Sequence, residues 1–299
     1  MTNLILLLVC LVLGLLLQHV KSLPKDAHLT LNSLILHVPL PALALITIPL
    51  LKFDIGLISL CLAPWILFAC SFVFFYVLGK KLGWSDSVIG CLTLTAGLGN
   101  TAFVGFPVIE AVYGKEALKL AVLLDQPGSF LIVSSIGIWV AAHYSAGKLR
   151  KRDLARKVAF FPPFMAFSMA LILGFFGWEA EGELKNILER LASILTPLAL
   201  ISVGLQLKIG ELKHDLKYLS IGLGFKLILS PLIIFALYWP LHLPSLVFKV
   251  AVLESAMAPM ITGSIVAAAN NLHPRLAGTM LGVGVPLSFL TLWAWYSFL

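Results

Sequence analysis

The chain has 299 residues, of which 60% are hydrophobic and 12% are charged, and its mean hydropathy is +1.01. Soluble domains carry roughly 25% charged residues, so the composition excludes an ordinary soluble protein and predicts one embedded in a lipid bilayer. The net charge of +7 does not indicate nucleic-acid binding, because the charges lie in short loops between apolar runs. No Walker loop, GxSxG or HExxH pattern occurs, so we predict no enzymatic activity and no cofactor.

Apolar runs bounded by charged or turn-forming residues predict an all-α polytopic membrane protein with ten transmembrane helices. Each run is long enough to cross the bilayer core, which takes about 20 helical residues. In chain order, the predicted helices cover residues 3–20, 29–51, 55–79, 86–113, 116–143, 158–177, 183–207, 218–239, 245–270 and 275–298.

The distribution of lysine and arginine predicts the orientation of these helices. Fourteen of the 21 basic residues fall in one set of loops and six in the other, and Lys226 lies inside a helix. Because basic residues concentrate in cytoplasmic loops, both termini are expected outside, and the basic loop 144–157 is expected in the cytoplasm.

The same loop divides the chain into two halves, 1–143 and 158–299, with five predicted helices each. An odd number of helices per half gives two similar halves opposite orientations, which is the inverted-repeat arrangement of many carriers. Short sequence matches support the repeat: PGSFL at 127–131 resembles PLSFL at 286–290, and ALIT at 44–47 resembles ALIS at 199–202.

The fourth and ninth predicted helices are each interrupted by glycine, proline and polar residues, at 97–107 and 254–264. Lipid offers no partner for freed backbone groups, so broken helices persist only where protein or a water-filled cavity surrounds them. A matched pair of breaks, one in each half, indicates a transporter binding site.

The new helix ends inside each break favour different ligands: the N-terminal ends favour a carboxylate, and the freed carbonyl groups favour a cation. Asn100 is costly in lipid and lies in a break, so we expect it to bind substrate. For the small polar residues Ser255, Thr262 and Ser264, taken one by one, close helix packing is favoured over a binding role. The predicted substrate site consists of Asn100, Thr101, Gly105, Pro107, Pro259 and Thr262.

Three charged residues lie near the middle of predicted helices: Asp125, Lys226 and Glu254. A charge at the bilayer centre costs about 2.5–3.5 kcal/mol on insertion scales, so each needs a reason. In a purely structural reading, Lys226 pairs with one acid and the other acid is protonated. In a functional reading, the unpaired carboxylate carries a proton or Na⁺ that is coupled to transport. The sequence does not decide which acid would pair with Lys226.

The string GNTAFVGFPVIEAVYG at 99–114 resembles the GNT-x-x-x-G-x-P stretch of the auxin efflux carrier family. The segment around Glu254 and Pro259, together with NLHP at 271–274, is similar to the ninth helix and following loop of that family. The resemblance covers essentially the whole chain. The short central loop resembles bacterial members, which implies the bacterial inner membrane, with both termini in the periplasm.

This resemblance implies two inverted five-helix repeats, similar to those of bile-acid sodium symporters, with helices four and nine crossing at their breaks. A scaffold domain (helices 1, 2, 6 and 7) would face a transport domain (helices 3–5 and 8–10), and homodimers would be common. Asn100, Pro107 and Pro259 match the crossover. Glu254 lies in the region that similar sodium symporters use for ion binding. Family substrates are organic anions, including auxin, malate and malonate.

We therefore predict a secondary active carrier for small organic anions, working by an elevator or rocking motion and coupled to H⁺ or Na⁺. The first alternative is a sodium symporter of the bile-acid type for amphipathic anions. The second is a membrane sensor that retains the carrier fold without transporting. Expected partners are the organic anion and the lipid bilayer.

Overall fold

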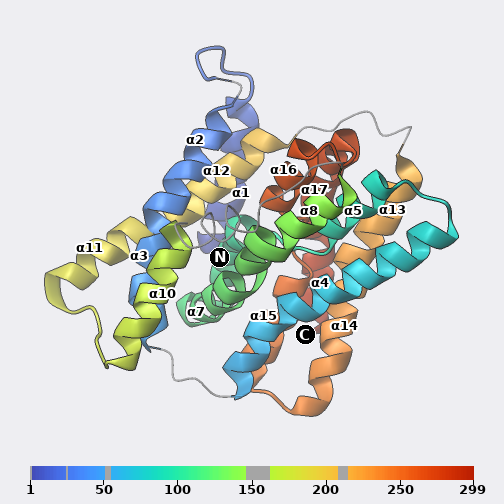
Figure 1. The fold of residues 1–299 in the computed structure, drawn as a ribbon. Helices are drawn as coiled ribbons and strands as arrows, with labels where there is room; N and C mark the ends of the chain where they lie inside the picture. The colour runs from blue at the N-terminus through green and yellow to red at the C-terminus, as the bar shows by residue number, and fades with distance from the viewer. Residues whose placement is uncertain (1, 25, 51–54, 146–161, 208–214) are drawn as a thin grey trace.

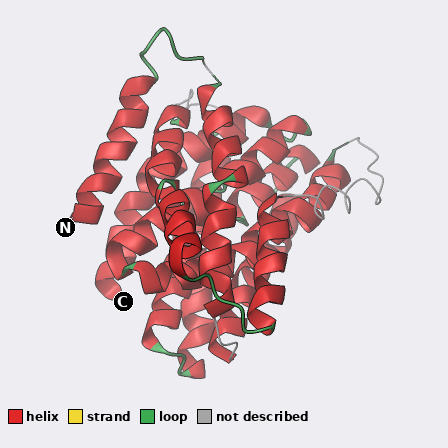
Figure 2. Cartoon of the chain, turned by 90° about the vertical axis from the view of Figure 1, so that its left-hand side faces the viewer, coloured by secondary structure: helices red, strands yellow, loops and turns green. Residues whose placement is uncertain are grey.

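The computed structural model describes residues 2–24, 26–50, 55–145, 162–207 and 215–299. Every regular element in these ranges is a helix, and the one extended pairing is an isolated bridge between Gly99 and Pro259 (Figure 2). Apart from its first two residues, the basic loop predicted at 144–157 lies outside the described residues.

The described residues of the first half form eight α-helices together with short 3-10 (η1) and π-helical (η2 to η4) segments. These are α1 (Thr2–Leu17), α2 (Ala27–His37), α3 (Pro39–Thr47), η1 (Ile48–Leu50), α4 (Ile55–Lys81), α5 (Asp86–Ala96), η2 (Thr101–Gly105), α6 (Phe106–Tyr113), α7 (Lys115–Leu124), η3 (Asp125–Phe130), η4 (Val133–Gly137) and α8 (Ile138–Tyr144).

The second half has a similar series, with one π-helical segment (η5) and one 3-10 segment (η6). The elements are α10 (Pro162–Phe175), α11 (Gly182–Ser193), α12 (Leu195–Gln206), α13 (Leu216–Gly224), η5 (Phe225–Leu229), α14 (Ser230–Tyr238), η6 (Trp239–Leu241), α15 (Ser245–Ser255), α16 (Ile261–Ala269) and α17 (Pro274–Phe298).

Six helical stretches within the described ranges have the length and apolar composition needed to cross a membrane. They are Ala27–Leu50, Gly56–Lys81, Lys115–Tyr144, Gly182–Gln206, Leu216–Leu241 and Pro274–Phe298. Shorter apolar helices cover Ile5–Leu17, Asp86–Ala96, Thr101–Tyr113 and Met165–Phe175. The chain is a multi-pass helical membrane protein, and these stretches fall within or close to the ranges predicted from sequence.

Two of the long stretches bend where proline interrupts the backbone hydrogen bonding. The first bends at Val38, directly before Pro39, because proline has no N–H to donate to the preceding turn. The second bends at Ile194, between α11 and α12, three residues before Pro197.

The helices form two groups (Figure 1). In one group, α2 packs against α12, α3 packs against α10 and α11, and α1 packs against α12. The other group contains α4 to α8 and α13 to α17, and it meets the first where α1 contacts α6 and where α12 contacts η2. The two groups are drawn on the left and right of Figure 1, with α7 near their boundary.

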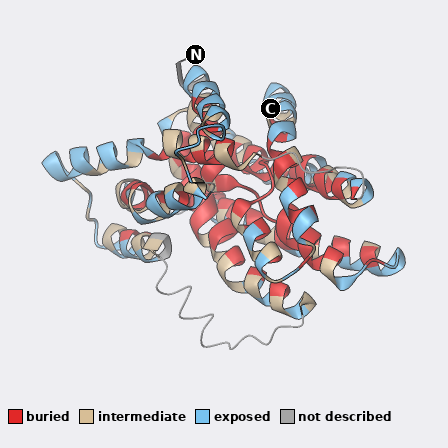
Figure 3. Ribbon diagram, turned by 90° about the horizontal axis from the view of Figure 1, so that it is seen from above, coloured by how far each residue is buried: buried red, intermediate tan, exposed pale blue. Residues whose placement is uncertain are grey.

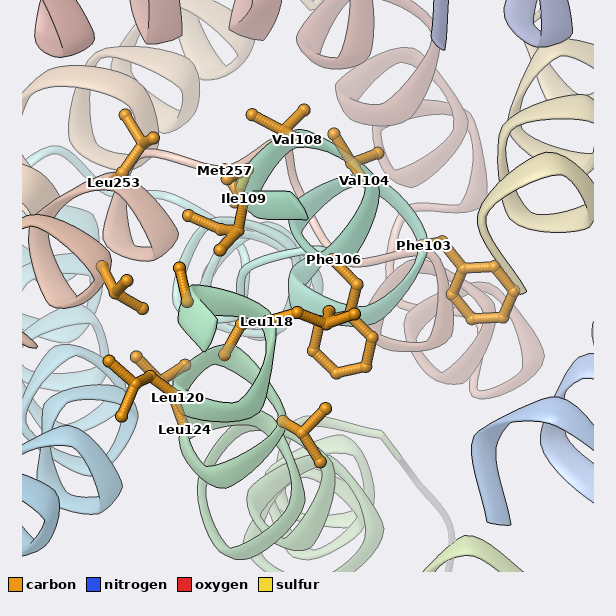
Figure 4. Close-up of a cluster of buried hydrophobic side chains, with 14 of the residues drawn as sticks. Phe103, Val104, Phe106, Val108, Ile109, Leu118, Leu120, Leu124, Leu253 and Met257 are labelled. Atoms are coloured by element: carbon orange, nitrogen blue, oxygen red, sulfur yellow. The ribbon is translucent and has the colours of Figure 1, made fainter. Parts of the chain in front are cut away.

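Burial is concentrated in the middle of the molecule, and exposed residues lie around its rim (Figure 3). Many rim side chains are large and apolar, including Ile172, Phe175, Leu290 and Trp293. In water such a surface would be unfavourable, but lipid is as apolar as these side chains. The largest buried cluster surrounds α6 and α7, where Phe103, Phe106, Ile109, Leu118 and Leu124 pack together (Figure 4).

Candidate functional site

The two interrupted helices meet at their breaks. Helix α5 ends at Ala96 and helix α15 ends at Ser255. After each of these ends, a short non-helical segment precedes the next helix. The two non-helical segments pair through the antiparallel bridge between Gly99 and Pro259. The interruptions predicted from sequence in both segments are therefore confirmed, and the structure places them in contact.

Backbone hydrogen bonds hold this crossover together. The N–H of Asn100 donates to the carbonyl of Ala258 over 2.8 Å, and the N–H of Met260 donates to the carbonyl of Leu98 over 3.1 Å. Pro259, between these partners, has no N–H that would be left unpaired. Each break thus supplies hydrogen-bond partners for the other, which explains how non-helical backbone persists inside an apolar protein.

A cavity of about 210 Å³ lies beside the crossover. Its polar lining includes Asn100, Asp125, Ser134 and Thr262. The rest of the lining is apolar and comes from both helix groups: Leu36 and Leu40 from α2 and α3, and Ala102, Phe103, Phe130, Val133, Ile138, Met260, Ile261 and Val266 from the other group.

Two helix N-termini open onto this cavity, because the helix after each break begins among its lining residues. One begins with η2 at Thr101, directly after Asn100, and the other with α16 at Ile261. The first N–H groups of a helix have no intrahelical acceptor and carry partial positive charge. Asn100 adds a further donor, since its side chain is 1% exposed and its amide nitrogen has no hydrogen-bond partner. These donors are suited to an anion.

Asp125 is the acidic residue of the cavity wall, and each of its carboxylate oxygens accepts a hydrogen bond. One oxygen accepts from the hydroxyl of Thr101, and the other accepts from the side-chain amide of Gln126 over 2.8 Å. Sequence reasoning missed Gln126, although a polar residue next to a mid-helix acid was a usable signal. Asp125 and Gln126 both lie in the π-helical segment η3, and such segments occur frequently at functional sites.

Neither Lys226 nor Glu254 is among the described residues that line this cavity. In the described part of the chain Lys226 forms no direct ion pair with Asp125 or Glu254, although its charge interacts with that of Glu254 without contact. Its ammonium instead donates to the carbonyl of Ser255 over 3.0 Å. The carbonyls of Val252, Leu253 and Glu254 accept from backbone N–H groups just beyond the helix end, and the Ser255 carbonyl accepts from Lys226.

Glu254 is 1% exposed, and neither of its carboxylate oxygens has a hydrogen-bond partner. The carboxylate packs against Gly105, so closely that a Cβ at that position would overlap it. Of the other predicted substrate residues, Thr262 lines the cavity. Pro107, buried at the start of α6, and Pro259, which forms the bridge, are not among the described residues that line the cavity.

Comparisons with known proteins agree with this arrangement. The family model described as "membrane transport protein" matches residues 1–296. An uncharacterized transporter of Methanothermobacter thermautotrophicus is 29% identical over 292 residues, covering 96% of this chain and 94% of that protein. An uncharacterized transporter of Methanocaldococcus jannaschii is 27% identical over 281 residues, covering 91% of this chain and 90% of that protein. The chain therefore belongs to the membrane transport protein family, the family of the auxin efflux carriers.

Proposed function

We propose that this membrane transporter is a secondary active carrier of small organic anions, which it binds in the crossover cavity. The observation that carries the proposal is the buried, unpartnered amide of Asn100, located where two helix N-termini open onto one cavity. The apolar side chains around these donors suit the hydrocarbon or aromatic body of a carboxylic acid.

The position of Asp125 in the cavity wall supports coupling of anion transport to a second ion. A carboxylate in the cavity wall repels a bound anion unless a proton or a cation is bound with it. The same carboxylate is held by Thr101 and Gln126, so it has a fixed position beside the substrate. We infer that the anion is transported together with H⁺ or Na⁺.

The proposed architecture is ten membrane helices in two inverted repeats, 1–143 and 158–299. Support comes from a crosswise packing that occurs twice. In the second and seventh predicted helices, α2 packs on α12 and α3 on α11. In the fourth and ninth, α5 packs on α16 and α6 on α15. In each pair, the first part of one predicted helix packs on the second part of the other. A two-fold axis in the membrane plane produces this pattern.

The proposed mechanism is alternating access, with α1–α3 and α10–α12 as scaffold and the remaining helices as the moving transport domain. The cavity supports this division, since Leu36 and Leu40 of the scaffold face polar residues of the transport domain across it. We place both termini in the periplasm of a bacterial inner membrane, because basic residues are concentrated in the opposite loops.

Binding and uptake by purified protein test this function. Thermal unfolding is measured with malonate, malate and indole-3-acetate, because a ligand that binds the native state raises its stability. Uptake of each stabilising acid is then measured in proteoliposomes. Asn100→Ala is expected to lower affinity about tenfold or more, the loss of one hydrogen bond to a charged group.

Asn270→Ala is the matched control, because Asn270 lies at the end of α16 and its amide bonds the carbonyl of Val266. It should bind and transport as the unmodified protein does. Full uptake by folded Asn100→Ala would contradict the proposed site. Binding without any uptake would favour a sensor instead.

A further inference from the structure

Lys226 has an unusual environment for a lysine inside a membrane protein. It lies on η5, is 1% exposed, and its ammonium contacts a neutral backbone carbonyl and forms no ion pair in the described part of the chain. Burial of an ammonium is costly unless acceptors surround it. The acceptor it uses, the carbonyl of Ser255, belongs to the last residue of α15.

The end of α15 has the chemistry of a cation site. The last carbonyls of a helix carry partial negative charge. At the end of α15 those of Val252, Leu253 and Glu254 accept from Ala256 and Met257, which leaves the Ser255 carbonyl to the lysine. In transporters with interrupted helices, such freed carbonyls coordinate Na⁺. Glu254, one residue before the helix end, adds a carboxylate with no hydrogen-bond partner on either oxygen.

The ammonium of Lys226 is seated at this end of the helix. Besides bonding Ser255, it lies against Gly99 of the other break, where a Cβ would be 3.1 Å from the lysine nitrogen and 3.4 Å from the carbonyl oxygen of Glu254. The crossover therefore has two sides. The helix N-termini open onto the anion cavity, whereas the C-terminus of α15 is covered by a lysine of the protein itself.

We propose that the Lys226 ammonium is a built-in cation that fills the position of a coupling Na⁺ at the end of α15. The inference rests on the proposed function and narrows it: transport requires no Na⁺ from solution, and the coupled ion is a proton. Asp125 and Glu254 are the acids at the crossover, so a proton would be carried by one of them. Removing the lysine should expose a Na⁺ site made of carbonyl groups and the Glu254 carboxylate.

The test compares thermal unfolding of the purified protein in NaCl and in choline chloride at equal ionic strength. The unmodified protein should unfold at the same temperature in both salts. Lys226→Met, which keeps an unbranched apolar side chain, should gain a Na⁺-dependent rise in Tm of a few degrees. The double variant Lys226→Met/Glu254→Gln should lose that rise. Lys249→Met, in α15, is the control for loss of a positive charge.

A Na⁺-specific rise in the unmodified protein would overturn the proposal, as would a folded Lys226→Met that does not respond to Na⁺. If Lys226→Met does not fold in choline chloride, it and Lys226→Gln are purified in both salts. Recovery in NaCl alone supports the proposal, and failure in both salts contradicts it. These measurements need no substrate, so their failure is distinguishable from failure of the proposed transport function, which the uptake experiment tests.

Discussion

The two acidic residues near the crossover, Asp125 and Glu254, have different contacts. The hydroxyl of Thr101 is one of two donors to Asp125, and the other is the amide of Gln126. Glu254 has no donor and is enclosed by neighbouring atoms, including Gly105. The two acids therefore differ, since both oxygens of Asp125 accept a hydrogen bond and neither oxygen of Glu254 does.

Thr101→Val should destabilise the protein by about 1–3 kcal/mol, because a buried carboxylate oxygen loses its donor while the side-chain shape is kept. Thermal unfolding in detergent measures this as a fall in Tm. Thr101→Ser retains the hydroxyl and should lose much less stability. Equal losses in the two variants would show that the methyl group, and not the hydrogen bond, is what matters.

Gly105→Ala should also destabilise, by about 1–3 kcal/mol, because the added methyl group overlaps the Glu254 carboxylate. Ordinarily, replacing a glycine in a helix by alanine stabilises by about 1 kcal/mol. Gly224→Ala is the control, since nothing lies within 4 Å of a Cβ there. Shortening the acid, in Gly105→Ala/Glu254→Ala, should recover part of the loss. If Gly105→Ala unfolds no earlier than the unmodified protein, this packing argument is wrong.

At the scale of elements, small residues set the distance between helices. Helices α1 and α12 cross where Gly14 faces Gly204, and a Cβ on Gly14 would be 2.8 Å from the Cα of Gly204. Close backbone approach of this kind is a main source of helix association in membranes, where apolar side chains gain nothing over lipid. The crossing therefore holds α1 on the first helix group.

Gly14→Val should loosen α1 from α12, because the added side chain would collide with the backbone of α12. We expect a lower Tm together with faster proteolysis near the N-terminus. Gly278→Ala in α17, where a Cβ meets nothing within 4 Å, should neither lower Tm nor speed proteolysis near the N-terminus. Unchanged proteolysis in a folded Gly14→Val variant would count against the role given to this crossing.

At the scale of the whole molecule, few polar contacts between described residues join the two helix groups. One is the hydrogen bond from the Thr196 hydroxyl on α12 to the Glu110 carboxylate on α6, over 2.9 Å. Under the proposed mechanism the groups move relative to one another, so this contact must break in every cycle. A covalent link at the same place should stop the cycle.

The double variant Glu110→Cys/Thr196→Cys tests that expectation. Joining the two thiols by oxidation or by a short bifunctional reagent should abolish uptake in proteoliposomes, and reduction of a disulfide should restore it. Each single variant, treated identically, is the control and should retain uptake. Full transport by the linked protein would rule out relative motion at this contact.

The positions of the two helix breaks followed from sequence, because glycine, proline and polar residues inside an apolar run have a strong local cost in lipid. The helix ranges and the bends near Pro39 and Pro197 were predictable for similarly local reasons. The family was also recognisable from the motif around Asn100. These features depend on the residues within one or two helical turns.

Only the tertiary structure shows which groups the three buried charged residues contact. The sequence marked Asp125, Lys226 and Glu254 as one buried group, but only the packing of η3, η5 and α15 shows Asp125 on the cavity, Lys226 on the Ser255 carbonyl and Glu254 against Gly105. The position of a charged residue in the middle of an apolar helix predicts that its side chain is buried. The atoms that contact the buried side chain come in part from helices distant in the chain. For this protein the sequence alone determined where the membrane helices are interrupted. The surroundings of each buried charged side chain were determined only by the packing of the helices, because those surroundings come mainly from other helices.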